Sequence, residues 1–159
     1  ALDGIYKLSM AGGKPRLKLS ESIEKVTLPG IKQVLRVFNS DGQFLGADAV
    51  VLAEEATADI IYHPFVPGES LIVAGYQQQP LLEPVMQNGK LIGTPPTLSD
   101  IALYAQKRLS LLPDEYKRFE YPHIYKTGIS GRLQELRNKL RDEYKKGKHE
   151  SAYPDRYSV

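Results

Sequence analysis

The chain has 159 residues, of which 42% are hydrophobic and 25% are charged, close to the average of globular proteins. It contains no cysteine, which excludes a disulfide framework, a zinc–thiolate site, an iron–sulfur cluster and a cysteine nucleophile. The net charge of +2 is too small for a general argument for nucleic-acid binding, and no apolar run is long enough to span a bilayer, so we expect no membrane contact.

The N-terminus has neither a methionine nor the pattern of a signal peptide. A strand-like run from Ile5 to Met10 follows almost at once, whereas independent domains usually begin with a few loose residues. We therefore expect the chain to be a piece of a larger protein, whether a fragment, a cleavage product or one half of a split protein.

The first half has the pattern of strands joined by turns. Branched and aromatic side chains are frequent, and Ala11–Lys14 and Asn39–Gly42 are typical turn sequences. The expected strands are Ile5–Met10, Arg16–Ser20, Lys32–Phe38 and Gln43–Ala53.

Prolines divide the middle of the chain into short extended pieces. Strands are expected at Leu71–Ala74, Leu81–Gln87 and Lys90–Ile92. Asn88-Gly89, between the last two, is the strongest short hairpin signal in the sequence.

The last third has helical periodicity. Thr97 and Asp100 form a capping box at the start of one helix, whose apolar positions repeat at helical spacing up to Pro113, with one further turn at 114–119. Ser130 is the expected cap of a second helix, and Gly147 its expected end. The apolar stripes are Leu98, Ile101, Ala105, Leu109 and Leu112 in the first helix, and Leu133, Leu136, Leu140 and Tyr144 in the second.

Strands followed by helices predict an α+β fold. We expect a β-rich segment at residues 1–94, a helical region at 95–149 and a tail at 150–159.

Motifs of catalysis and metal binding are missing from the sequence. His63, His123 and His149 have no partner at ligand spacing, so no metal site is expected. Neither a Gly-x-Ser-x-Gly elbow nor a phosphate-binding Gly-rich loop ending in Lys-Ser or Lys-Thr occurs. The residues alone therefore nominate no catalytic group.

The segment from Lys126 to His149 is basic, with eight lysines and arginines. One interpretation is an amphipathic helix that docks through its leucines and leaves its basic face in water. The alternative is a non-enzymatic binding or regulatory module that uses this helix as its contact surface, for example toward nucleic acid. The near-neutral chain favours the first interpretation.

Lys7 is the strongest single candidate for a functional residue. It lies within the expected first strand, where a lysine is disfavoured unless its ammonium reaches water, a carboxylate or a phosphate. Either it extends to the surface, or it holds an anionic group at the mouth of a site.

Three runs of residues resemble the C-terminal part of the nicotinate phosphoribosyltransferase family. They are Gly4-Ile5-Tyr6-Lys7-Leu8, Gly13-Lys14-Pro15-Arg16-Leu17-Lys18-Leu19-Ser20 and Glu24-Lys25-Val26-Thr27-Leu28-Pro29-Gly30-Ile31-Lys32-Gln33-Val34-Leu35-Arg36. The later helices, with Pro122-His123-Ile124-Tyr125-Lys126 between them, are similar to the helical region of that family.

The resemblance implies a cytoplasmic transferase of NAD biosynthesis, with glycosyltransferase and ATP-dependent ligase character. The family makes nicotinate mononucleotide from nicotinate and phosphoribosyl pyrophosphate, using ATP and Mg²⁺, as a dimer with sites at the subunit interface. The β-rich segment would complete the barrel and sandwich of a type II phosphoribosyltransferase. Lys7 would contact the pyrophosphate, where a cation stabilises substrate and leaving group.

The catalytic histidine and the phosphoribosyl loops of the family lie upstream of the matched region. The resemblance therefore implies that this chain contributes no catalytic residue and binds no cofactor alone. It would be inactive without the remaining N-terminal and barrel portion of the enzyme.

Overall fold

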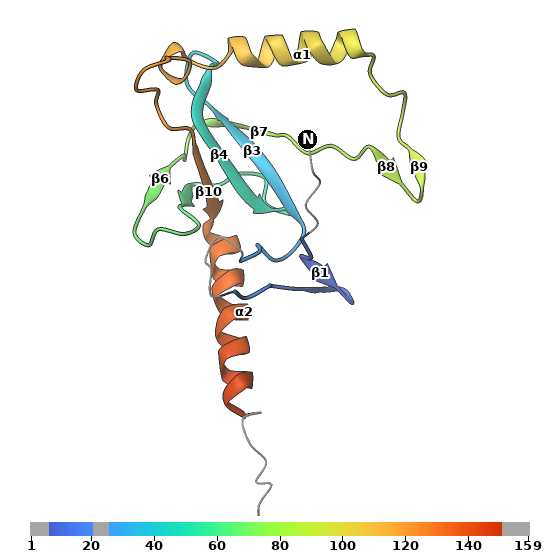
Figure 1. The fold of residues 1–159 in the computed structure, drawn as a ribbon, viewed down its shortest axis with the longest axis vertical. Helices are drawn as coiled ribbons and strands as arrows, with labels where there is room; N and C mark the ends of the chain where they lie inside the picture. Colours follow the sequence, from blue (N-terminus) through green and yellow to red (C-terminus); the bar gives the residue numbers. More distant parts are fainter. Residues whose placement is uncertain (1–6, 21–25, 151–159) are drawn as a thin grey trace, which may run out of the picture.

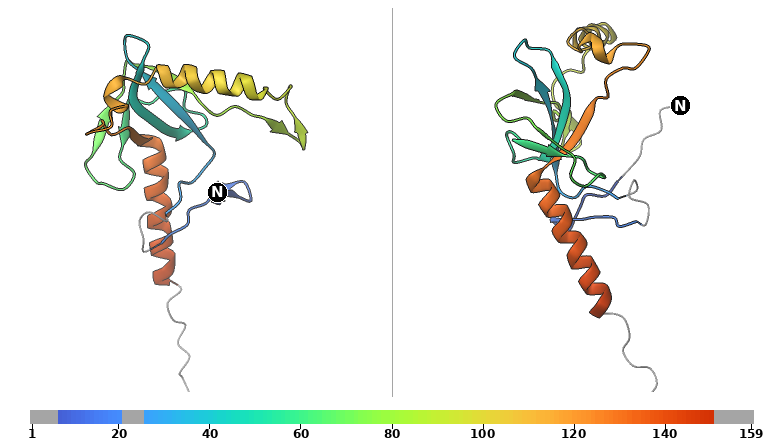
Figure 2. Two further views of the ribbon diagram at one scale, coloured as in Figure 1. Left: turned by 45° about the horizontal axis from the view of Figure 1, so that its top comes forward. Right: turned by 90° about the vertical axis from the view of Figure 1, so that its left-hand side faces the viewer.

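The computed structural model describes residues 7–20 and 26–150, with side chains up to residue 146. It confirms the α+β prediction: a mixed sheet occupies the middle, and the two helices lie at opposite ends of it (Figures 1 and 2). The elements in chain order are β1 (Met10–Ala11), β2 (Lys14–Pro15), β3 (Lys32–Phe38), β4 (Phe44–Leu52), β5 (Ile60–Tyr62), β6 (Ser70–Ile72), β7 (Gln77–Pro80), β8 (Met86–Gln87), β9 (Lys90–Leu91), α1 (Leu98–Ser110), the 3₁₀ turn η2 (Asp114–Tyr116), β10 (Lys126–Ser130) and α2 (Gly131–Glu150).

The central hairpin of β3 and β4 confirms the prediction from sequence. The two strands pair antiparallel, and the Asn39 side chain closes the turn by accepting hydrogen bonds from the backbone of Asp41 and Gln43 at 3.0 and 2.9 Å. An asparagine in this position stabilises a turn through its own side chain. The Asn88-Gly89 hairpin is confirmed too, as the β8–β9 pair, and Gly12-Gly13 forms the turn between β1 and β2.

β10 is a central strand that the sequence interpretation missed. It lies between β4, to which it is parallel, and β5, to which it is antiparallel, in the sheet order β6-β5-β10-β4-β3-β7. Gly128 is required here, because a Cβ at this position would lie 2.7 Å from Cβ of Ile61. The segments 1–94 and 95–149 thus share one sheet, and the division at residue 94 stays a prediction.

Three expected strands in the first 87 residues need correction. Residues 7–9 and 16–20 are not part of a strand, and residues 5 and 6 lie outside the described part. Of the expected strand at 81–87, only Met86–Gln87 forms a strand. Extended backbone at 16–20 keeps its alternation, with Leu17 and Leu19 half-buried. It lacks a neighbouring strand, however. The backbone N–H of Lys18 instead donates a hydrogen bond to the hydroxyl of Thr27. β5 and β7 were not anticipated, since a short strand beside a proline gives little pattern.

The core lies on both faces of the β3–β4–β10 sheet. One face gathers Leu35, Val37, Ala47, Ala49 and Val51, all buried. The other receives α2, where Leu52, Ile129 and the fully buried Leu133 form a second cluster. Alternation along β3 and β4 therefore determines which side chains face which cluster.

α2 begins as predicted. Ser130 Oγ accepts a hydrogen bond from the backbone of Leu133 at 3.2 Å and donates one to Glu55 at 2.8 Å. The predicted end at Gly147 is wrong, because the helix continues to Glu150. A glycine inside a helix costs only about 1 kcal/mol relative to alanine, and the neighbouring lysines and glutamate are good helix formers. The lower half of α2 extends beyond the sheet (Figure 1), which leaves Tyr144 58% exposed.

α1 begins at the predicted capping box, where Thr97 and Asp100 bond each other's backbone, but its expected burial is absent. None of its residues is buried, and Leu98 is 86% exposed. The apolar spacing predicted the helix correctly, but the described residues leave its apolar stripe exposed. Within the described part of the chain, no helix combines the length and the apolar character that crossing a membrane requires.

Candidate functional site

Lys7, the one site residue predicted from sequence, lies in coil and is exposed. The expectation of a lysine inside a buried strand is therefore wrong. The reason is that the ladder starts only at Met10, while the carbonyl of Ser9 accepts from the backbone of Arg16 and Gly30 at 2.8 and 3.0 Å. The bond from Gly30 holds Ser9 against the 28–32 segment, while the bond from Arg16 continues the pairing of the β1–β2 hairpin by one position.

Lys7 borders a shallow hollow of about 500 Å³. Its wall is formed by Lys7, Leu8, Ser9, Met10, Gly30, Ile31, Lys32 and Leu82. Among these residues two are cationic and none is acidic, so the hollow attracts an anion more readily than a cation.

Lys32 is the residue in this hollow that sequence reasoning missed. Its Nζ donates to the carbonyls of Leu28 and Gly30 at 2.9 and 2.6 Å, and burial lowers its pKa. A partly buried ammonium beside an exposed one at Lys7 concentrates positive charge in one place. The signal available in the sequence was its position directly after Pro29-Gly30-Ile31, where the backbone N–H of Gly30 bonds the carbonyl of Ser9.

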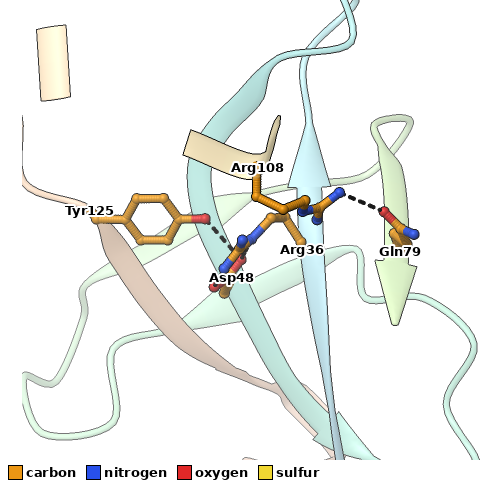
Figure 3. Close-up of polar contacts among 5 residues, drawn as sticks. All are labelled: Arg36, Asp48, Gln79, Arg108 and Tyr125. Carbon is orange, nitrogen blue, oxygen red and sulfur yellow. Dashed lines mark hydrogen bonds and ion pairs between the residues drawn. The ribbon is translucent and has the colours of Figure 1, made fainter. Parts of the chain in front are cut away.

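A second polar cluster joins β3, β4 and the segment before β10 (Figure 3). Arg36 and Asp48 are register partners on β3 and β4 and form a two-pronged ion pair, with Nε–Oδ1 at 3.0 Å and Nη2–Oδ2 at 2.9 Å. The Tyr125 hydroxyl donates to the same Oδ1 at 2.9 Å. Burial, reinforced by the charge of Asp48, raises the pKa of Tyr125.

Arg108 fastens the end of α1 to this cluster. Its guanidinium lies 4.9 Å from the ring centre of Phe44, while that of Arg36 lies 4.6 Å from the same centre. Arg108 also donates to Gln79 at 3.3 Å (Figure 3), and its Nη2 has no hydrogen-bond partner among the described residues. Cation–aromatic contacts and paired charges hold elements together here, and the arrangement contains no nucleophile or base aimed at open space.

The basic face of α2 is less uniform than its sequence implied. Arg132 forms an ion pair with Glu54 at 3.1 Å, and Arg137 donates to the carbonyl of Pro64 at 2.6 Å. Part of the positive charge therefore holds α2 to the rest of the fold.

The described residues bring no three His, Cys, Asp or Glu side chains together in a way that could hold a metal ion. His63 accepts hydrogen bonds from the backbone of its own loop, and His123 packs edge-on against Tyr116.

Comparison with known proteins gives these sites their context. The family model described as Nicotinate phosphoribosyltransferase C-terminal domain matches residues 31–137. The chain belongs to the nicotinate phosphoribosyltransferase family. The match includes Arg36, Asp48, Arg108 and Tyr125 of the polar cluster, and it begins after Lys7.

Relatives from animals and bacteria extend the similarity to most of the chain. The human nicotinate phosphoribosyltransferase is 40% identical over 144 residues, which are 88% of this chain and 27% of that protein. The Bacillus subtilis protein is 32% identical over 159 residues, 90% of this chain and 32% of its own length. The crystal structure of human nicotinic acid phosphoribosyltransferase superposes with a TM-score of 0.68 at 34% identity, covering 86% of this chain and 26% of that one.

The chain thus spans 27% and 32% of the length of these two nicotinate phosphoribosyltransferases and corresponds to their C-terminal part. The resemblance noted in the sequence is confirmed. In a nicotinate phosphoribosyltransferase, the hollow at Lys7 and the exposed α1 therefore belong to a C-terminal region that adjoins the rest of the enzyme.

The raised pKa of Tyr125 gives the fold a pH dependence. Above pH 10.0, the ordinary tyrosine value, the unfolded chain loses a proton that folded Tyr125 retains. The contribution of this group to stability is complete below that pH and is lost as the pH rises further. We expect the free energy of unfolding to fall more steeply between pH 9 and 11 in the wild type than in Tyr125→Phe, as measured by urea denaturation.

Tyr104→Phe is the matched control, because Tyr104 is an exposed tyrosine in the neighbouring α1. Its pH profile should follow that of the wild type, since the Tyr125 hydroxyl and its bond to Asp48 are kept. Identical profiles for all three proteins would contradict the assignment.

Proposed function

We propose that this chain is the C-terminal part of a cytoplasmic enzyme that makes nicotinate mononucleotide from nicotinate and phosphoribosyl pyrophosphate, with ATP and Mg²⁺, in NAD biosynthesis. The observation that carries the proposal is the match to the C-terminal domain of nicotinate phosphoribosyltransferase over residues 31–137. The chain contributes scaffold, interface and one phosphate contact. The nucleophilic and metal chemistry belongs to the remaining barrel portion, in a homo-oligomeric enzyme.

Pyrophosphate release that depends on nicotinate tests this proposal. We expect release by the enzyme that contains this chain together with its barrel portion, and none by the 159-residue chain alone. Activity of the isolated chain would contradict the proposal that it needs the barrel portion. Failure of the complete enzyme to form the mononucleotide would overturn the function itself.

The exposed face of α1 supports a docking role toward the remaining enzyme. A helix of 13 residues is marginal in water on propensity alone, and α1 is attached to the sheet chiefly through Arg108 at its last turn. Ile101 and Leu109 lie on its apolar stripe, 49% and 60% exposed. Apolar side chains at helical spacing are normally covered, and the two relatives contain about two to three times as much chain outside the matched region as within it.

One double variant, compared in the isolated chain and in the complete enzyme, tests this interface. Ile101→Gln/Leu109→Gln should change the thermal midpoint of the isolated chain little, because both side chains are already in water. In the complete enzyme the same variant should lower the midpoint by several degrees, about 2 °C per kcal/mol or more, as apolar burial is lost.

Ser99→Gln/Lys107→Gln is the control, since it alters polar positions of the same helix. Equal shifts for the two variants in the complete enzyme, or an unchanged midpoint for the apolar variant, would show that α1 stays in solvent.

Lys7 is the residue we assign to the pyrophosphate of phosphoribosyl pyrophosphate. Its exposed ammonium adjoins Lys32 in a hollow with no acidic wall residue, so an approaching phosphate meets positive charge from both. The neighbouring carbonyls of Leu28 and Gly30 hold Lys32 in place, which leaves Lys7 free to adjust to the ligand.

Lys7→Ala in the complete enzyme should raise the KM for phosphoribosyl pyrophosphate by about tenfold, the size of one charge-assisted contact, with little change in thermal midpoint. Lys14→Ala is the control, because Lys14 is exposed in the nearby β1–β2 hairpin and lies outside the hollow. A KM equal to that of the control would assign Lys7 to the surface.

A further inference from the structure

A second hollow, less open than the hollow at Lys7, lies along α2. It measures about 520 Å³ and lies between the helix, residues 17–19 and the β5–β6 loop at residues 63–67. Its volume falls within the roughly 300–1,000 Å³ of small-molecule pockets. We call it the α2 groove; it shares no wall residue with the hollow at Lys7.

Three cations form a row along one wall of the α2 groove. Arg137, Arg141 and Lys145 are four residues apart, a spacing that places them on one helix face. Like charges at this spacing repel, and burial together with the charge of Arg141 lowers the pKa of Arg137. None of the described residues lining the groove is acidic. An anion bound there would offset the repulsion.

These cations keep donors available for a ligand. Arg137 uses Nη1 toward the carbonyl of Pro64 at 2.6 Å, one of five N–H groups that a guanidinium carries. Arg141 lies 3.5 Å from the carboxylate of Asp142, at the limit of hydrogen bonding and on the exposed surface. The bond to Pro64 also fixes the distance between α2 and the β5–β6 loop, which keeps the groove open.

The lining contributed from outside α2 is largely apolar and contains an aromatic ring. Phe65 lies between Pro64 and Pro67 in sequence, and Leu17 and Leu19 face the same space. His63 stiffens this loop, because its Nδ1 accepts hydrogen bonds from the backbone of Phe65 and Val66 at 3.1 and 2.9 Å. A rigid wall of this composition suits a flat ring, while the cationic wall suits phosphate.

We propose that the α2 groove binds a nucleotide, with its phosphates on Arg137, Arg141 and Lys145 and its base against Phe65 and the flanking prolines. The groove has cationic and aromatic lining in one cavity. A site for phosphate alone would not need the aromatic ring, and an apolar docking surface would not need the row of cations. This site is separate from the phosphate contact proposed for Lys7, and neither depends on the other.

Calorimetric titration of the 159-residue chain with adenosine diphosphate, inorganic pyrophosphate and adenosine tests the assignment. We expect the diphosphate nucleotide to bind most tightly, since it alone engages both walls. Arg141→Gln/Lys145→Gln should weaken its binding by about tenfold or more. Lys139→Gln/Lys146→Gln removes the same charge from residues of α2 outside the groove and should change the affinity by less than about twofold.

The aromatic wall is tested in the same titration. Phe65→Leu should weaken the nucleotide and leave pyrophosphate unchanged, whereas Phe119→Leu, at a ring that is 99% exposed, should alter neither. Circular dichroism of each variant confirms that α2 is intact. Equal losses from the two charge variants, pyrophosphate binding as tight as nucleotide binding, or no binding of the nucleotide at all would each overturn the proposal.

Discussion

The pairing of β10 with β4 and β5 is the constraint on which the rest of the structure depends. β10 comes from the last third of the chain and lies between two strands from the first half, so β5 and β6 belong to the sheet only through it. The same strand ends at Ser130, which caps α2 and bonds Glu55. One central strand therefore fixes the sheet order, the start of α2 and the position of the β5–β6 loop.

A cluster of paired charges at the other end of the sheet positions α1, as Ser130 positions the start of α2. Arg36 and Asp48 meet across β3 and β4, Tyr125 bonds the same carboxylate just before β10, and Phe44 receives the guanidinium of Arg108 from α1. Partly buried charges with several hydrogen bonds hold a fixed geometry better than they add stability. The cluster thus specifies the direction of an otherwise exposed helix.

The two cationic hollows use opposite designs. At Lys7 the hollow is shallow and open, with one ammonium held by carbonyls and the other exposed. In the α2 groove the cations line a less open space whose other lining is largely apolar. A nearly neutral chain can therefore carry two clusters of cationic side chains, because the local arrangement of charges does not follow from the net charge.

Local patterns in the sequence determined much of this protein. The hairpin at Asn39–Gly42, the capping box of Thr97, the cap at Ser130 and the family itself were all readable, because each depends on residues close together in the chain. Tertiary structure alone decided the insertion of β10, the exposure of α1, the place of Lys7 outside a strand and the pairing of Arg36 with Asp48. Each of these brings together residues far apart in sequence, or depends on chain that lies elsewhere, and such contacts leave no local periodicity to read.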